Sequence, residues 1–254
     1  MSLKLFFKQT IAALLFTIFG FICILGNLIF IPIVILRLNK FKVVENLSRD
    51  IVCVSWKIFI QILRLFGYMN YTFEISTPLN KSSQLIVANH PSLLDVVFLI
   101  SKIRRANCVV KGSLDKNPFL FAAIKACNYI SNTKNEELLD KSIKALKSGQ
   151  ALIVFPEGTR TKGEITFHKA ASHIAIKAAS EVVGIAINMH PRSLAKDQPW
   201  YKTPDVMIKY EFKELFCLDV SGFLPHKSSA LRVRQLHEHI SEIYKKEFKD
   251  AKFD

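Results

Sequence analysis

A histidine followed five residues later by an aspartate is the first pattern in this sequence that could do chemistry. Residues 85–88 are apolar, Asn89 and His90 follow them, and Asp95 comes shortly after. An imidazole with a pKa of about 6.5 can act as a general base at neutral pH, and a nearby carboxylate can hold it in one orientation and raise its basicity. The pair is a candidate base with its orienting acid. Because the chain has seven histidines, such a pair also arises easily by chance.

A second candidate segment, residues 155–160, has the sequence Phe-Pro-Glu-Gly-Thr-Arg. Arg160 offers a forked donor for phosphate, Gly158 lets backbone N–H groups approach a ligand, and Glu157 can hydrogen-bond a hydroxyl or order the base. Three lysines add positive charge to this set: Lys111, Lys162 and Lys169. A surface ion pair between Glu157 and Arg160 in a turn is the alternative interpretation.

The sequence does not suggest a covalent acyl-enzyme. It has no Gly-x-Ser-x-Gly motif, and none of its five cysteines is placed as an evident partner of His90. The remaining chemistry is direct attack by a substrate hydroxyl whose proton the base removes. Direct attack suffices when the acyl donor is a thioester, because its thiolate leaves readily.

Both candidate segments follow apolar runs of the kind that form buried strands. The runs that end at His90 and at residue 155 are nearly continuous, which is typical of strands covered on both faces of a parallel sheet. Strands alternate with helical segments, so the sequence predicts an α/β fold with a central, mostly parallel sheet flanked by helices. Ligands of such sheets bind beyond the carboxyl ends of the strands, where both candidate loops would lie.

The other elements of this domain are predicted from hydrophobic pattern and capping residues. Further strands are expected at residues 71–75, 106–111, 182–187 and 206–212. Helices are expected at residues 93–100 with Ser92 as the cap and at 118–127 beginning with Pro118. Another is expected between residues 133 and 149, with Thr133 or Asn135 as the cap and Gly149 as the end. The last two are expected at residues 169–180 and 228–248.

The N-terminal part of the chain predicts a membrane segment. No charged residue occurs between Lys8 and Arg37, a stretch of about 28 residues, whereas a helix needs roughly 20 to cross a bilayer. The stretch is too long for the core of a signal peptide, and no small-x-small cleavage site follows it. Gly26, Asn27 and Pro32 permit a kink, so a tilted span and a re-entrant or interfacial helix both remain open.

Basic residues indicate the orientation of this segment. More of them follow it than precede it: Arg37, Lys40, Lys42 and Arg49 lie after it, and Lys4 and Lys8 lie before it. By the positive-inside rule we expect the protein in the cell membrane, with its catalytic domain on the cytoplasmic side.

Residues 51–66 predict a second helix, with a narrow polar stripe formed by Lys57, Gln61 and Arg64. Two interpretations of this helix are open: it packs on the core of the domain, or it lies in the membrane surface with its stripe facing lipid head groups. The expected organisation is therefore a set of N-terminal membrane-anchoring helices, residues 1–70, followed by a catalytic domain, residues 71–254.

The net charge of +14 fits nucleic acid, an anionic membrane or a phosphorylated substrate as a partner. The apolar N-terminus favours the membrane, and nucleic-acid binding is not expected because basic and aromatic residues do not interleave. The five cysteines form no Cys-x-x-Cys pair and are expected to be reduced and buried. His237 and His239 would point in different directions on a helix, so no metal site is expected.

Residues 89–95 and residues 155–160, taken together, resemble the glycerolipid acyltransferase family, which includes the 1-acylglycerol-3-phosphate acyltransferases. The resemblance covers about residues 85–188. It implies transfer of a fatty acyl group from acyl-CoA or acyl-carrier protein to a lysophospholipid hydroxyl, with no other cofactor. It gives His90 the role of base and Asp95 that of orienting acid. It also implies a set of residues that handle the acceptor: Lys111, Glu157, Gly158, Thr159 and Arg160.

Several positions depart from the pattern of that family. Asn132 and Thr133 stand where relatives often have an acidic residue and an arginine that contacts phosphate. Ala170 replaces a usual glycine, and Val182 and Ile185 replace frequent prolines. These departures leave open the acylation of a non-glycerophosphate lipid or a polyene-type acceptor. A non-catalytic lipid-binding protein on the same fold is a further alternative, although a binder has no need for a base together with its acid.

Overall fold

The chain begins with two long helices. The computed structural model describes residues 3–199 and 201–249. Helix α1 spans Leu3–Ile35 and continues through Pro32, and α2 spans Lys42–Leu65 after the short 3-10 helix η1, Leu38–Lys40. Helix α2 starts well before the predicted residue 51, because the mostly polar residues 42–50 interrupt the apolar period without being poor helix formers.

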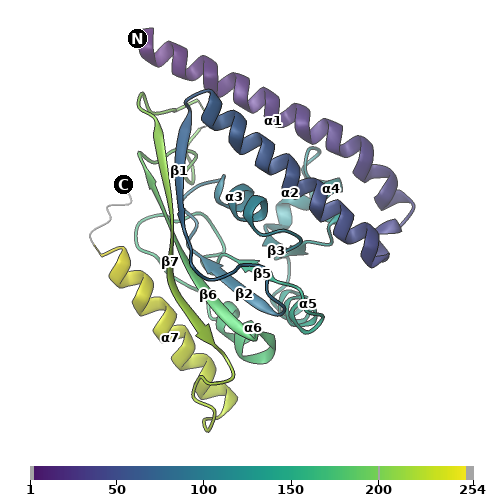
Figure 1. Cartoon of the computed structure of the whole chain (residues 1–254), viewed down its shortest axis with the longest axis vertical. Coiled ribbons are helices and arrows are strands. Elements are labelled where there is room, and N and C mark those ends of the chain that lie inside the picture. Colours follow the sequence, from purple (N-terminus) through teal and green to yellow (C-terminus); the bar gives the residue numbers. More distant parts are fainter. Residues whose placement is uncertain (1–2, 200, 250–254) are drawn as a thin grey trace.

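Seven strands form one sheet in the order β1-β7-β6-β2-β5-β3-β4 (Figure 1). Their bounds are β1 Met69–Glu74, β2 Gln84–Ala88, β3 Asn107–Val110, β4 Ile130–Ser131, β5 Leu152–Val154, β6 Glu181–His190 and β7 Ile208–Asp219. Neighbouring strands are parallel except β6 and β7, which are antiparallel. The predicted α/β fold with a mostly parallel sheet is confirmed. Strand β4 was not predicted, since two residues are too few to show a period.

The remaining helices lie between and after the strands. They are α3 Asp95–Lys102, the short 3-10 helix η2 Gly112–Lys116, α4 Phe121–Ala126, α5 Asn135–Lys147, α6 Ala170–Ala178 and α7 Ser229–Glu247. The predicted end of α5 is correct, because Gly149 follows the helix in the left-handed region at φ +81°. Ser228, which was predicted as the first residue of the last helix, is instead the cap of α7 and accepts a 3.4 Å hydrogen bond from the Leu231 N–H.

Two predicted helix starts are wrong. Pro118 precedes α4 instead of opening it, because Asn117 forms a turn in which its Oδ1 accepts a 2.9 Å hydrogen bond from the Phe119 N–H. Neither Thr133 nor Asn135 caps α5, because the cap position falls on Lys134, whose side chain has no acceptor. In both cases local turn geometry moved the first helical residue away from the expected cap.

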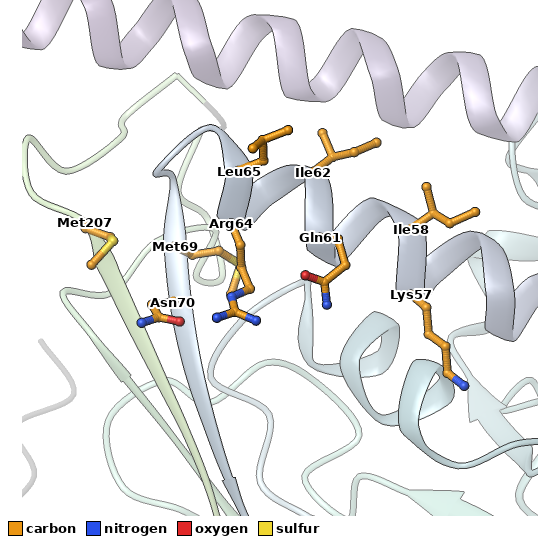
Figure 2. A pocket seen from close by; sticks show the side chains of 9 residues that line it. All are labelled: Lys57, Ile58, Gln61, Ile62, Arg64, Leu65, Met69, Asn70 and Met207. Atoms are coloured by element: carbon orange, nitrogen blue, oxygen red, sulfur yellow. The ribbon is translucent and has the colours of Figure 1, made fainter.

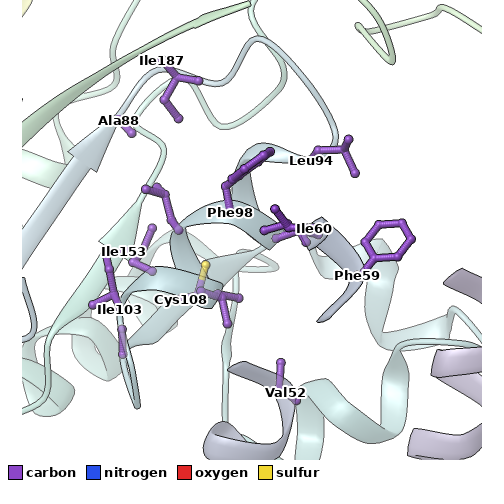
Figure 3. Close-up of a cluster of buried hydrophobic side chains, with 14 of the residues drawn as sticks. Val52, Phe59, Ile60, Ala88, Leu94, Phe98, Ile103, Cys108, Ile153 and Ile187 are labelled. Carbon is purple, nitrogen blue, oxygen red and sulfur yellow. The ribbon is translucent and has the colours of Figure 1, made fainter. Parts of the chain in front are cut away.

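The helices cover the two faces of the sheet in two apolar layers. Ile86 and Ala88 point into a cluster with α1, α2, α3 and α4, whereas Leu85 and Val87 point into a second cluster with α5, α6 and α7. This alternation follows from the two-residue period of a strand. It explains why the β2 run is apolar throughout. Figure 3 shows the first cluster, where Phe98 of α3 lies between the sheet and α2 residues such as Ile60.

Helix α2 is joined to the sheet domain by a buried arginine. The Arg49 side chain is 1% exposed and its Nη2 lies 2.9 Å from Glu45 Oε1. Its Nε donates to the Cys127 carbonyl at 2.9 Å, and its Nη1 donates to the Arg105 carbonyl at 3.1 Å and to Gln150 Oε1 at 2.9 Å. Of the two interpretations of the second helix, packing on the core is therefore correct for the face that carries Arg49.

Helix α1 is held against the domain along its length. The Lys8 ammonium donates to the Gly67 carbonyl at 3.2 Å, and the Asn27 amide donates to the Pro118 carbonyl at 2.8 Å. The opposite face is apolar and exposed, with Phe21 at 60% and Leu28 at 69% exposure. Residues 6–35 form a helix long and apolar enough to cross a membrane, with a mean hydropathy of 2.7.

Candidate active site

His90 and Asp95 are hydrogen-bonded just beyond the carboxyl end of β2. The His90 Nδ1 lies 2.7 Å from Asp95 Oδ2. The Asp95 side chain is fully buried, while 15% of the His90 side chain is exposed. The other ring nitrogen, Nε2, has no hydrogen bond to a residue that the structure describes, so it is available to a ligand. The predicted proximity of the two residues is confirmed.

Asp95 is the first residue of α3, and the chain folds back onto its carboxylate. The Ser92 N–H donates to Asp95 Oδ2 at 2.7 Å, while the Ser92 hydroxyl donates to the Ser193 carbonyl at 3.0 Å. Ser92 is therefore not the predicted cap of a helix starting at residue 93. Burial raises the pKa of the Asp95 carboxyl above its usual range, while His90 and the Ser92 N–H counteract that shift.

Glu157 fixes the backbone of the His90 loop. Its Oε1 accepts hydrogen bonds from the His90 N–H at 2.8 Å and from the Thr161 hydroxyl at 2.7 Å. The Thr161 N–H in turn donates to the His90 carbonyl at 2.7 Å. Glu157 is buried, and that burial raises the pKa of its carboxyl while these partners favour the charged form. The alternative interpretation, a surface ion pair of Glu157 with Arg160, is wrong, because Glu157 is buried and this pair is absent from the ion pairs of the described residues.

The segment around Gly158 faces outward next to the histidine. The rings of Phe155 and His90 have centroids 4.4 Å apart. Gly158 has φ +66°, a left-handed conformation that favours glycine, and its N–H donates to the Phe155 carbonyl at 3.0 Å. Gly158 and Thr159 are exposed. The turn thus presents backbone of this segment to solvent beside the candidate base.

Arg160 binds protein carbonyls in this structure. Its Nη1 donates to the Leu194 carbonyl at 2.8 Å and to the Ala195 carbonyl at 2.9 Å. We call residues 192–195, which follow β6, the strap. Since Nη1 is occupied, only the other N–H groups of the guanidinium could bind a phosphate.

The strap joins the two candidate loops to each other. The Leu93 N–H donates to the Leu194 carbonyl at 3.2 Å, and the Arg192 Nη2 donates to the Thr161 carbonyl at 2.9 Å. Sequence reasoning missed the strap because it is irregular and carries no motif. Its only signal was a polar stretch after a strand that ends at the same edge of the sheet as His90.

Lys111 directly follows β3, at the same edge of the sheet as the other candidates. The strands β2, β5 and β3 are parallel neighbours, so their carboxyl ends place His90, Glu157 and Lys111 along one edge. The Lys111 side chain is exposed. Beside it, the Gly112 N–H donates to Asn132 Oδ1 at 2.8 Å, so the residue that departs from the family pattern is used to hold the loop.

Two further residues fix the end of β2, and neither was singled out from the sequence. The Asn89 side chain pairs with Ile187, donating to its carbonyl at 2.9 Å and accepting from its N–H at 2.7 Å. The hydroxyl of Tyr244, on α7, lies 2.8 Å from the Val87 carbonyl and 2.9 Å from the Ile185 carbonyl. Both side chains therefore extend the β2–β6 pairing up to the histidine.

Neither the cysteines nor a metal cluster adds a second reactive group to the site. Four of the five cysteines are buried as expected and Cys217 is exposed. Burial raises the pKa of the Cys108 and Cys127 thiols to about 12, which disfavours the reactive thiolate. Within residues 3–199 and 201–249, no three His, Cys, Asp or Glu side chains gather as metal ligands.

Comparison with known proteins adds a family to this geometry. Residues 70–188 match the family model described as Acyltransferase. The chain is 31% identical over 147 residues to a 1-acyl-sn-glycerol-3-phosphate acyltransferase of Saccharomyces cerevisiae, covering 53% of this chain and 48% of the yeast protein. The match therefore spans about half the length of that relative. A protein of the same description from Helicobacter pylori is 26% identical over 193 residues, covering 72% of this chain and 77% of that protein.

A solved structure shares the fold. The crystal structure of the 1-acyl-sn-glycerophosphate (LPA) acyltransferase PlsC from Thermotoga maritima aligns with a TM-score of 0.61 at 23% identity. The alignment covers 93% of this chain and 98% of that one. The likeness therefore extends over most of the chain and shows a shared fold.

Proposed function

We propose that the protein is a membrane-bound O-acyltransferase, and the match of residues 70–188 to the Acyltransferase family model supports this proposal. It transfers a fatty acyl group from an acyl thioester, acyl-CoA or acyl-carrier protein, to a hydroxyl of a lysophospholipid such as 1-acylglycerol-3-phosphate. The observation that carries the proposal is the 2.7 Å hydrogen bond between His90 Nδ1 and the buried Asp95 carboxylate, which leaves Nε2 for a substrate.

In the proposed reaction His90 is the general base. Its Nε2 takes the proton of the acceptor hydroxyl while that oxygen attacks the thioester carbonyl carbon. The C–S bond then breaks, and the leaving sulfur takes the proton from the imidazolium, so an ester and a thiol are formed. Asp95 accepts the Nδ1 hydrogen bond throughout, which holds the tautomer and stabilises the imidazolium. The reaction so written needs no cofactor besides the acyl donor.

The other predicted site residues divide into two roles in this proposal. Glu157 is a positioning residue, because its carboxylate is engaged by the backbone of His90 and the hydroxyl of Thr161. Gly158 and Thr159 are exposed beside the histidine and face the acceptor. A second set supplies positive charge to the acceptor phosphate: exposed Lys111 and the remaining N–H groups of Arg160.

We propose that α1 anchors the domain within one leaflet of the membrane. A helix that crossed the bilayer would point away from the domain, whereas α1 is hydrogen-bonded to it through Lys8 and Asn27, and η1, just after α1, through Asn39. Its exposed face is apolar, which suits the acyl region of a leaflet. Basic residues near both ends of α1 support the cytoplasmic leaflet of the cell membrane. The division into anchoring residues 1–70 and catalytic residues 71–254 remains a proposal.

Replacement of the histidine tests the catalytic proposal. We expect His90→Ala to abolish thiol release from an acyl thioester in the presence of lysophosphatidate, while the variant still folds and sediments with membranes. His173→Ala is the matched control, because His173 is exposed on α6 away from both candidate loops. Retained turnover in His90→Ala would contradict the proposal. Binding of lysolipid by the unaltered chain without thiol release from either donor would favour a non-catalytic lipid-binding protein.

One observation favours a second acceptor class. Asn132 lies beside Lys111 with its amide oxygen bound to the Gly112 N–H, so positions 132 and 133 offer an acceptor phosphate no cation. A lipid or polyene-type acceptor without a glycerophosphate would need none. Turnover assays with lysophosphatidate and with a long-chain alcohol, each with the same thioester, separate the two classes.

A further inference from the structure

A groove outside the catalytic loops runs over the outward face of α2. It has a volume of about 760 Å³ and lies between α2 and the beginnings of β1 and β7 (Figure 2). The lining residues are Lys57, Ile58, Gln61, Ile62, Arg64, Leu65, Met69, Asn70 and Met207. In Figure 2, Ile58, Ile62 and Leu65 point toward one side of α2, and Lys57, Gln61 and Arg64 point toward the other. One wall is therefore apolar and the other is polar and cationic.

Two basic side chains line the polar wall and a third lies beside it, without a carboxylate partner. Lys57 and Arg64 are lining residues, and Lys57 is exposed one helical turn before Gln61. The Arg64 guanidinium carbon lies 5.1 Å from the centre of the Tyr71 ring, and the Lys102 ammonium lies 4.8 Å from the same centre and donates to the Tyr71 hydroxyl at 3.2 Å. None of the three cations forms an ion pair within the part of the chain that the structure describes. An anion bound at this wall would therefore be attracted by cations that no carboxylate neutralises.

The apolar wall is continuous with the exposed apolar face of the protein. Along α2, exposed apolar residues recur at spacings of four and seven, which places them on one side of the helix: Val43, Leu47, Val54, Ile58 and Leu65. Leu65, at the end of the groove, is 84% exposed. A ligand here meets an anion-binding wall on one side and a lipid-compatible surface on the other.

We propose that this groove binds the phosphate head group of an anionic membrane phospholipid, with Lys57, Arg64 and Lys102 on the phosphate and the lipid chains along Ile58, Ile62 and Leu65. The charge complementarity and the adjoining apolar face identify a membrane lipid as the occupant. The proposal does not depend on the catalytic assignment, because none of these side chains contacts His90 or Asp95 within the described contacts.

Native mass spectrometry of the full chain in a neutral detergent tests the proposal. The probes are dioctanoyl-phosphatidylglycerol, dioctanoyl-phosphatidylcholine and inorganic phosphate. We expect the phosphatidylglycerol to bind most tightly, and the triple variant K57Q, R64Q, K102Q to bind it on the order of 100-fold more weakly, since each basic residue near an anionic surface contributes roughly a fivefold to tenfold factor. The control K144Q, K147Q, K177Q removes the same charge from exposed lysines of α5 and α6 and should bind like the unaltered chain.

A variant that binds the lipid more tightly shows that lost binding in the triple variant is not caused by misfolding. Gln61 lies between Lys57 and Arg64 on the polar wall, so Gln61→Lys should tighten the binding of phosphatidylglycerol and Gln61→Glu should weaken it. His90→Ala should bind it unchanged, which separates this site from the proposed reaction. Equal binding of the two lipids, unaffected by the triple variant, would overturn the proposal. Inorganic phosphate that binds as tightly as the lipid would also overturn it. A triple variant whose main defect is a raised KM for lysophosphatidate would do so as well, because that result would assign the groove to the acceptor.

Discussion

The Asp95 carboxylate receives two hydrogen bonds on one oxygen, from the His90 ring and the Ser92 backbone. Because one of the two donors is the His90 ring, the charge of the Asp95 carboxylate acts directly on the imidazole. A buried carboxylate stays ionised only when partners stabilise the charge, and here one of those partners is the base itself. Asp95 is therefore coupled to the protonation state of His90 throughout the proposed reaction.

We predict that Asp95→Asn lowers kcat by roughly 10⁴-fold with little change in KM, because an amide at this position favours the wrong imidazole tautomer and cannot stabilise the imidazolium. Thiol release from the acyl thioester, measured over a range of substrate concentrations, checks this prediction. Asp140→Asn, an exposed change on α5, should leave both constants unchanged. A defect in KM alone would show that Asp95 acts in binding rather than through the base.

A second carboxylate provides a pH-dependent prediction about stability. Hydrogen bonds from Arg104 and then Arg105 hold the pKa of the Asp50 carboxyl well below its usual range. Its stabilising effect is therefore complete above the ordinary Asp pKa of about 3.9 and is lost as the pH falls below it. We expect the unfolding midpoints of the unaltered chain and Asp50→Asn to differ at pH 6, and the difference to shrink progressively as the pH falls below about 4. Thermal unfolding followed by circular dichroism measures both, and a gap independent of pH would contradict the assignment.

At the level of the elements, α2 is part of the folded core as well as of the exposed apolar face. Its buried side contains Arg49, which binds the carbonyls of Cys127 and Arg105 and pairs with Glu45. The sequence pattern predicted this helix and its polar stripe but not Arg49, because an arginine in a mixed segment has no sign of burial until its carbonyl partners come from distant loops. Ser92 was misassigned as a cap for a similar reason, because the carbonyl that its hydroxyl binds belongs to Ser193, in a distant loop.

We predict that Arg49→Leu destabilises the chain by about 2–4 kcal/mol, because the substitution leaves the carbonyls of Cys127 and Arg105 without their donor, although Lys42 still pairs with Glu45. The free energy of unfolding in urea, measured in detergent, checks the value. Arg104→Leu serves as the matched control. Arg104 is in an exposed ion pair with Asp50, and such pairs contribute about 0–1 kcal/mol. Equal effects of the two substitutions would contradict the role of Arg49.

Much of the site was predictable at this scale and part of it was not. The apolar runs that end at His90 and at Phe155 predicted buried strands of a parallel sheet, and β2 and β5 are hydrogen-bonded neighbours in that sheet. The strap was not predictable, because its backbone carbonyls, which bind Arg160 and the Leu93 N–H, carry no side-chain signature. The position of Tyr244 was equally hidden, since it depends on how α7 packs across the sheet.

At the level of the whole molecule, the exposed apolar face of α1 is expected to determine membrane attachment. We predict that the double variant Phe21→Glu, Leu28→Glu moves the protein from the membrane pellet to the soluble fraction, because each carboxylate in the apolar layer costs up to a few kcal/mol. Both residues are exposed, so the unfolding midpoint should change little. Fractionation after carbonate washing measures attachment. Lys144→Glu, Lys147→Glu on α5 should remain in the pellet, and a double variant of α1 that stays there would contradict the assignment.

The hydrogen bond from the Asn27 amide to the Pro118 carbonyl ties the apolar helix to the domain, and the proposed anchoring has a consequence for the membrane as a whole. Under the proposal that α1 anchors the domain in one leaflet, acylation is one-sided, and each new lipid molecule enters the leaflet that holds the protein. The area of that leaflet would then grow first, so balanced growth of the membrane would require a separate activity that moves lipids across it.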